Sequence, residues 1–155
     1  MLEGVFQDEH GDYPAGSYVR NPPTTSHTPG SDDGCTIFVK LWQFDMEDRT
    51  QFRKQMTLEP EAGQDDIATL ELHRDAREVV RYHQIAADTP FEIIAPGGIE
   101  MLVLDGSLSE GGDQLKTGSW LRLPEGESLK AVTGQSGARV WVKTGHLPFA
   151  KPPAA

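Results

Sequence analysis

Short apolar runs, separated by turns rich in Gly, Pro and Asp, recur along most of the chain. Many of them alternate apolar with polar residues, and such runs with high β propensity predict strands. The alternation is clear in residues 35–44, where Cys35, Ile37 and Val39 share one face. We predict an all-β fold, because runs at roughly ten-residue spacing are typical of a β-sandwich or barrel. The predicted strands are residues 2–6, 17–21, 35–44, 68–73, 77–85, 91–96, 99–106, 119–124, 128–134 and 138–145.

Residues 45–66 break this rhythm because they are highly charged and contain Pro60 and Gly63. We predict a short helical turn near Glu47–Phe52 and then an exposed linker that adds little to any core, since buried charges need partners. The tail is rich in Pro and Ala and is expected to be disordered. The predicted organisation is a first β unit at 1–44, a linker at 45–66, a second β unit at 67–147 and a disordered tail at 148–155.

An internal repeat relates the two β units. Residues 2–23 align with residues 104–125, and the same register continues farther along with a shift of one residue. Glycines, strand faces and aromatic residues keep one register, so the chain holds two copies of one β unit. The matched pairs are Leu2/Leu104, Gly4/Gly106, Gly16/Gly118, Ser17/Ser119, Tyr18/Trp120, Arg20/Arg122, Pro22/Pro124, Gly34/Gly137, Cys35/Ala138, Phe38/Trp141, Val39/Val142 and Lys40/Lys143.

The two copies differ in length. Strands at residues 68–103 precede the shared segment of the second copy, whereas the first copy starts with that segment. A barrel without its first half would leave strand edges and a core face uncovered. Two explanations are open: the chain is a truncated piece of a longer protein, or another chain covers the surface. We expect truncation.

Several motifs of the first copy resemble the cupins related to ChrR, a zinc-dependent anti-sigma factor. They are LEG at 2–4, DEHGDYPAG at 8–16, RNPP at 20–23, HTP at 27–29 and GCTIFVKL at 34–41. The resemblance is strong over residues 1–44 and weaker over residues 68–147. It implies double-stranded β-helix barrels of the RmlC-like jelly-roll type, here a bicupin whose first barrel is incomplete.

The resemblance also implies a divalent metal in the barrel mouth, held by a first motif His-x-His-x-x-x-Glu and a histidine of a second motif. The second-motif histidine matches His27, and the first motif is absent from the chain. Metal sites use three or four protein ligands, so we expect little or no metal in this chain alone. In the complete parent protein we expect zinc, with iron or manganese as alternatives. The other reading of His27 is a loop histidine that hydrogen-bonds locally beside Pro29.

The second copy lacks metal ligands at the matching positions. These positions fall on Ile93, Ala95, Ile99 and Leu129, and Glu100 lies beside the glutamate position rather than on it. We predict a barrel that keeps the cupin architecture with apolar groups in place of the metal site.

The remaining candidate residues have plainer interpretations. His10 lies in an acidic turn and is assigned to turn structure, with metal ligation as the alternative. His73 and His83 lie on predicted strands and are expected at the surface or a sheet edge, whereas His146 carries no signal. Cys35 is expected to be a small apolar core residue rather than a redox thiol.

Composition and charge exclude several classes of function. The chain has 14 Lys and Arg against 24 Asp and Glu, a net charge of −10. Nucleic-acid binding and docking to anionic membranes need clustered basic residues. No apolar run approaches the roughly 18 residues of a membrane span, and no secretory signal is visible at the N-terminus. We expect a soluble, cytoplasmic protein.

Two classes of function remain. The first is a non-enzymatic sensor or regulatory cupin, in which occupancy of the barrel changes a partner interaction. The alternative is a fragment of a metal-dependent dioxygenase that cleaves diketones or acetophenones, which needs a complete metal site. No His-x-x-x-Cys-x-x-Cys motif of an anti-sigma zinc domain occurs, so this chain alone is not expected to bind a sigma factor. A homodimer formed through sheet edges is also expected.

Overall fold

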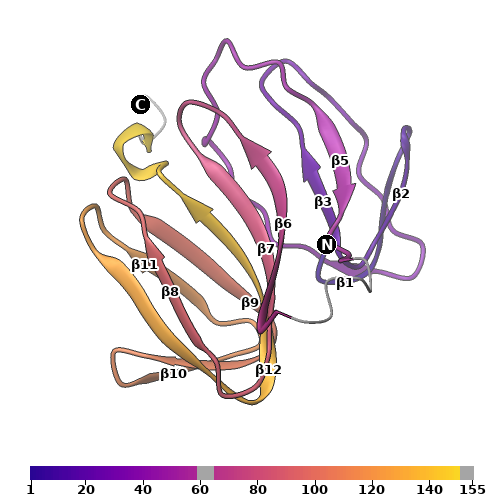
Figure 1. Ribbon diagram of the computed structural model, residues 1–155. Coiled ribbons are helices and arrows are strands. Elements are labelled where there is room, and N and C mark those ends of the chain that lie inside the picture. The colour runs from indigo at the N-terminus through magenta and orange to yellow at the C-terminus, as the bar shows by residue number, and fades with distance from the viewer. Residues whose placement is uncertain (59–64, 151–155) are drawn as a thin grey trace. The chain divides into compact units, whose positions relative to one another are not determined.

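A computed structural model of the chain describes residues 1–58 and 65–150 and divides the chain into two compact units. The first unit runs from Met1 to Thr57, and the second from Leu58 to Ala150. Regular structure in both is almost entirely β, as predicted (Figure 1). The strands are β1 (Glu3–Asp8), β2 (Gly11–Pro14), β3 (Ser17–Arg20), β4 (Cys35–Thr36), β5 (Phe52–Gln55), β6 (Ile67–Arg74), β7 (Val79–Ile85), β8 (Pro90–Ile94), β9 (Ile99–Glu110), β10 (Asp113–Lys116), β11 (Trp120–Leu123) and β12 (Ser128–Thr144).

The second unit is built on two long antiparallel strands, β9 and β12, which pair along most of their length (Figure 1). The later part of β12 and the earlier part of β9 form one sheet with the order β6-β7-β12-β9-β11. The other halves form a second sheet with the order β8-β12-β9-β10. Two sheets that share two bent strands make a jelly roll, as predicted for this unit.

Strand β12 combines two runs that the sequence analysis predicted as separate strands. The predicted runs, residues 128–134 and 138–145, are joined through a register shift between Thr133 and Ala138. Such a shift bends a strand without ending it. The bend allows β12 to contribute to both sheets.

The core of the second unit lies between its two sheets. Ile99 and Leu129 are fully buried there, and Ile93 and Ala95 pack against the same cluster. These are the four positions at which the repeat places missing metal ligands, and they share one interior, as predicted. The other buried members are Ile85, Phe91, Met101, Val103, Leu108, Ala131, Ala138, Val140 and Val142.

The internal repeat has the same local structure in both units. The Met1 nitrogen donates to the Ser17 carbonyl at 2.7 Å, and the matching Val103 nitrogen donates to Ser119 at 2.9 Å. Gly4 lies opposite Cys35 across the β1–β4 pair, as Gly106 lies opposite Ala138 across β9–β12. The shared segment is therefore one structural motif used twice.

The first unit contains the sheet β2-β1-β4 and the pair β3-β5. The prediction of a strand over residues 35–44 is wrong beyond Thr36, because in the described residues only Cys35 and Thr36 join a ladder. The matching stretch of β12 is paired with β7 on one edge and β9 on the other. Residues 37–44 have no such ladder within 1–58 and 65–150, and Leu41 and Trp42 are exposed.

The expected linker contributes to the first unit. In place of a helical turn, the chain makes a tight turn at residues 45–48 and then strand β5, which pairs with β3. The reason is Arg20 on β3, which is buried, so its charge requires a partner. Asp48 supplies that partner, and Arg20 also donates to the Thr50 carbonyl at 2.7 Å and stacks on Phe44. The part of the predicted linker at 59–64 lies outside the described residues.

The end of the second unit is ordered farther than predicted. Residues Leu147–Phe149 form a 3-10 helix, η2, and its last two residues belong to the segment 148–155 that was expected to be disordered. The Arg77 guanidinium stacks over the Phe149 ring at 4.8 Å, which fixes this turn. Residues 151–155 lie outside the described residues. Among the described residues, no helix is long and apolar enough to cross a membrane.

Candidate functional sites

His27 in the first unit is held by a buried carboxylate. Its Nδ1 lies 3.2 Å from Oδ2 of Asp8, and the Asp8 side chain is only 2% exposed. An ionised carboxylate only accepts hydrogen bonds, so Nδ1 carries the proton. A proton on Nδ1 leaves Nε2 as the ring nitrogen available to a metal, the arrangement common to metal-ligating histidines.

Asp8 is itself fixed by several donors. Burial alone would raise the pKa of its carboxyl, but hydrogen bonds from the His10 amide, the Tyr13 hydroxyl and the His27 ring hold that pKa below its usual value. Asp8 therefore stays ionised and keeps His27 in one tautomer. His10 contributes its backbone to the turn, as predicted, and its carbonyl accepts from Arg53 at 2.8 Å.

Cys35 is partly buried, and its thiol is free. It lies at the β1–β4 pairing opposite Gly4. Its matching residue in the second unit, Ala138, belongs to the apolar core. The core assignment of Cys35 stays a prediction.

The second unit has a cavity of about 310 Å³ beside its apolar core. Its polar lining includes Arg81 and His83 of β7, which project into the same space as Ile93, one of the blocked metal positions. Arg81 is partly exposed and lies 3.6 Å from Glu71. The other lining residues are Ile67, Val79, Phe91, Glu92, Ile94, Val142 and Thr144.

His83 was predicted at the surface or a sheet edge, and this prediction is wrong. Its side chain is buried, packs edge-on against Phe91 and forms a hydrogen bond with the Thr69 hydroxyl at 2.9 Å. Burial and then the nearby Arg81 charge lower the pKa of His83 to about 4. His83 is therefore neutral at pH 7 and can exchange hydrogen bonds in the cavity.

A buried side-chain contact joins Glu100 and His146, although His146 carried no signal in the sequence. Nε2 of His146 lies 3.0 Å from a Glu100 carboxylate oxygen, and Arg122 lies 3.8 Å from the other oxygen. Glu100 projects away from the core face of β9, since its neighbours Ile99 and Met101 lie in the core. Glu100 therefore lies outside the core cluster that contains the blocked metal positions.

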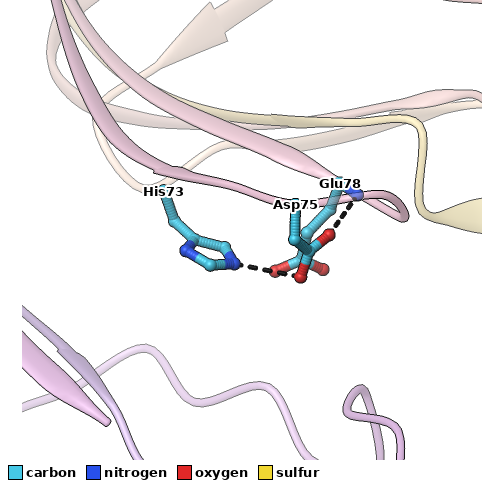
Figure 2. Close-up of side chains that lie close together, drawn as sticks. All are labelled: His73, Asp75 and Glu78. Atoms are coloured by element: carbon cyan, nitrogen blue, oxygen red, sulfur yellow. Dashed lines mark hydrogen bonds and ion pairs between the residues drawn. The ribbon is translucent and has the colours of Figure 1, made fainter. Parts of the chain in front are cut away.

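The hairpin between β6 and β7 gathers His73, Asp75 and Glu78, whose side chains point toward one another in Figure 2. Their ligand atoms all lie within 4.8 Å of one another. Within residues 1–58 and 65–150 this is the one close group of three or more potential metal ligands, so His27 has no such group around it.

Each member of this cluster is positioned by the hairpin. Nε2 of His73 lies 3.0 Å from Oδ2 of Asp75, while Oδ1 of Asp75 accepts the amides of Arg77 and Glu78. Burial would raise the pKa of Asp75, but these hydrogen bonds lower it below its usual value. Glu78 is buried and forms an ion pair with Lys143 of β12.

The expectation that His73 lies at the surface or a sheet edge is confirmed in part. Strand β6 lies at the edge of its sheet, but the His73 side chain is only 8% exposed and contacts Asp75. The sequence did hold a signal. His73, Asp75 and Glu78 flank one tight turn, and a hairpin turn brings such positions together. The spacing of these three residues predicts a cluster only when the turn of the hairpin is placed between residues 74 and 79.

A known family matches the first unit of the chain. Residues 1–45 match the family described as ChrR Cupin-like domain, which confirms the resemblance predicted from the motifs of the first copy. No curated protein matches the chain.

Solved structures with similarity to the chain include ChrR of Rhodobacter sphaeroides in complex with SigE. It is 15% identical with a TM-score of 0.47, covering 51% of this chain and 44% of that chain. A Rhizobium leguminosarum protein of unknown function is 20% identical with a TM-score of 0.46, and the match covers 55% of this chain and 86% of that chain. A cupin superfamily protein of Desulfitobacterium hafniense is 18% identical with a TM-score of 0.46, and the match covers 54% of this chain and 81% of that chain.

Proposed function

We propose that the chain is part of a non-enzymatic regulatory cupin that senses a small molecule through the barrel of its second unit. The observation that carries this proposal is the cavity beside the blocked metal position. Ile93, Ile99 and Leu129 leave no ligands for a metal there, while Arg81 and His83 still give the cavity polar groups. Apolar walls with a few convergent polar groups are typical of small-molecule sites.

We propose an organic anion with an apolar body as the ligand, to be held by Arg81 although Glu92 also lines the cavity and Arg81 lies 3.6 Å from Glu71. Arg81 supplies a permanent positive charge, and neutral His83 supplies a further polar contact. Ile67, Val79 and Val142 supply apolar walls. A carboxylate at the Arg81 side with its chain against these walls satisfies both features.

The test compares hexanoate with hexanol, which share the apolar chain and differ in charge. In NMR titrations we expect hexanoate to shift the resonances of Val142 and His83 at lower concentration than hexanol. In the variant Arg81→Met, the affinity for hexanoate should fall about tenfold and approach that for hexanol, because a charge-assisted hydrogen bond is lost.

The matched control is Arg139→Met, which removes an exposed arginine of the same unit that pairs with Asp105. This variant should bind both probes as the unchanged chain does. Equal binding of hexanoate and hexanol by the unchanged chain would contradict the proposed ligand class.

We also propose that His27 ligates a divalent metal in the complete parent protein, with zinc favoured. The support is its match to the second cupin motif and the Asp8 carboxylate at its Nδ1. The remaining ligands would come from the His-x-His-x-x-x-Glu strands that the resemblance implies. A sigma-factor partner, as in the ChrR complex with SigE, would then require a further domain of that parent.

The expected result for His27 is measured in a chain extended at its N-terminus with strands that carry His-x-His-x-x-x-Glu. Zinc affinity there should fall by at least about tenfold in His27→Ala and by a similar factor in Asp8→Asn, since partners that orient a ligand matter nearly as much as the ligand. His10→Ala serves as the control. Zinc binding that survives His27→Ala would contradict the assignment.

A further inference from the structure

We propose that the β6–β7 hairpin binds a divalent transition-metal ion through Nε2 of His73, a carboxylate oxygen of Asp75 and Oε1 of Glu78 (Figure 2). This site lies at a turn of the second unit and uses none of the four blocked barrel positions. Metal binding at this site would contradict the expectation that this chain alone holds little or no metal.

The first argument is an unsatisfied oxygen. The Glu78 side chain is only 5% exposed, and its Oε1 has no hydrogen-bond partner, although Oε2 is bound by Lys143. A buried carboxylate oxygen without a partner is unfavourable, and such atoms call for an explanation. Oε1 belongs to the residue that completes the cluster with His73 and Asp75, where a cation would satisfy it.

The second argument is the geometry of the other two donors. His73 is 8% exposed, and its Nε2 already lies beside Oδ2 of Asp75 at 3.0 Å. Oδ1 of Asp75 is used by the amides of Arg77 and Glu78, so the loop holds Oδ2 toward the imidazole. The hairpin therefore orients these donors before any ion arrives, which lowers the entropy cost of binding.

The donor set selects the class of metal. One imidazole nitrogen and two carboxylate oxygens suit zinc, manganese or iron, whereas calcium takes six to eight oxygen ligands. Lys143 forms an ion pair with Glu78, and this pair opposes a cation. Asp75 and Glu78 supply two carboxylates to the cluster, and carboxylates attract a divalent ion.

The experiment is a Zn²⁺ titration of the untagged 155-residue chain by isothermal calorimetry, with Mg²⁺ as the comparison ion. We expect one Zn²⁺ per chain and no Mg²⁺ binding at the same concentrations. Zn²⁺ affinity should fall at least about tenfold in His73→Gln and in Glu78→Gln, each of which removes one ligand. Asp75→Asn should weaken binding while its remaining oxygen still accepts the loop amides.

The matched control is His10→Ala, which removes a histidine that belongs to neither proposed metal site and should bind Zn²⁺ as the unchanged chain does. A second variant, His27→Ala, separates the hairpin site from the metal role proposed for His27. If a hairpin variant fails to fold, the imidazole resonances of His73 in the unchanged chain decide the question, since Zn²⁺ should shift them at stoichiometric concentration. Zn²⁺ binding that is lost in His27→Ala, or that leaves the His73 resonances unmoved, would overturn the proposal.

Discussion

Replacing Asp48 by alanine is expected to destabilise the first unit by about 3–5 kcal/mol, the usual cost of removing one partner from a buried ion pair. Arg20 is 2% exposed and binds both oxygens of Asp48, so its guanidinium would be left buried without that carboxylate. The Thr50 carbonyl and the Phe44 ring cannot replace the lost charge. Hydrogen exchange of the β3 and β5 amides measures the effect, since these strands flank the pair.

The same residue gives the first unit a defined dependence on pH. Hydrogen bonds from Arg20 outweigh burial and lower the pKa of Asp48 to about 2 from its usual 3.8. A carboxyl whose pKa is lower in the folded than in the unfolded state stabilises the fold at any pH above the unfolded-state pKa. This stabilisation is lost as the pH falls through the folded-state pKa. We therefore expect a loss of about 2 kcal/mol between pH 4 and pH 2, which should be absent from Asp48→Asn.

Asp33→Ala is the control for both measurements. Asp33 is an exposed acidic residue in a loop of the same unit, and its replacement should change stability by less than about 0.5 kcal/mol. Equal exchange rates in Asp48→Ala and Asp33→Ala would show that Arg20 does not depend on Asp48.

Gly106→Ala is expected to destabilise the second unit by more than about 3 kcal/mol, because positive-φ strain and overpacking act together. Gly106 has a φ of 76°, and a Cβ at this position would overlap the Gly137 carbonyl oxygen. That oxygen belongs to backbone at the β9–β12 crossing and cannot move aside as a flexible side chain would. Urea denaturation followed by the fluorescence of the buried Trp141 measures the loss.

Gly111→Ala separates the two causes. Gly111 also has a positive φ, 58°, but a Cβ there meets no atom within 4 Å. Its replacement should therefore cost only the left-handed backbone penalty of about 1–2 kcal/mol. If both variants lost the same stability, the close approach of β9 and β12 at Gly106 would not matter.

The strands of the second unit could be predicted from the sequence because their signals are local. Alternation and turn residues identify β6, β7, β8 and β11 to within a few residues. The limits of β12 could not be predicted in this way. Gly134 and Gly137 lie at the junction of its two runs, and glycines usually signal a turn. Because β12 pairs with β9 both before and after this junction, the two runs form one bent strand.

Pairings between distant residues explain the errors in the first unit. The charge of residues 45–66 indicated an exposed linker, but Asp48 pairs with a buried arginine 28 positions earlier, and β5 then pairs with β3. Residues 37–44 show the reverse error. Their apolar and polar residues alternate as in a strand, but this pattern indicates only a propensity to pair. Whether a ladder forms depends on the partner strands.

The candidate sites show the same division between local and distant signals. His27 was identified by its motif, whereas the Asp8 carboxylate that orients it became visible only when the β1–β2 hairpin was placed. His83 and His73 were assigned to the surface or a sheet edge because a strand face alone does not reveal what covers it. The blocked positions Ile93, Ile99 and Leu129 were found because the repeat supplied a register.

Strand β12 follows β7, β8 and β9 in the chain, yet it pairs with all three. During synthesis these strands emerge from the ribosome before the strand that joins them exists. Their open edges are templates for wrong pairing with other chains, and contacts between distant residues form slowly. A ribosome-associated chaperone that shields strand edges would therefore matter more for this unit than for a β-meander of equal size, whose strands pair as soon as they appear.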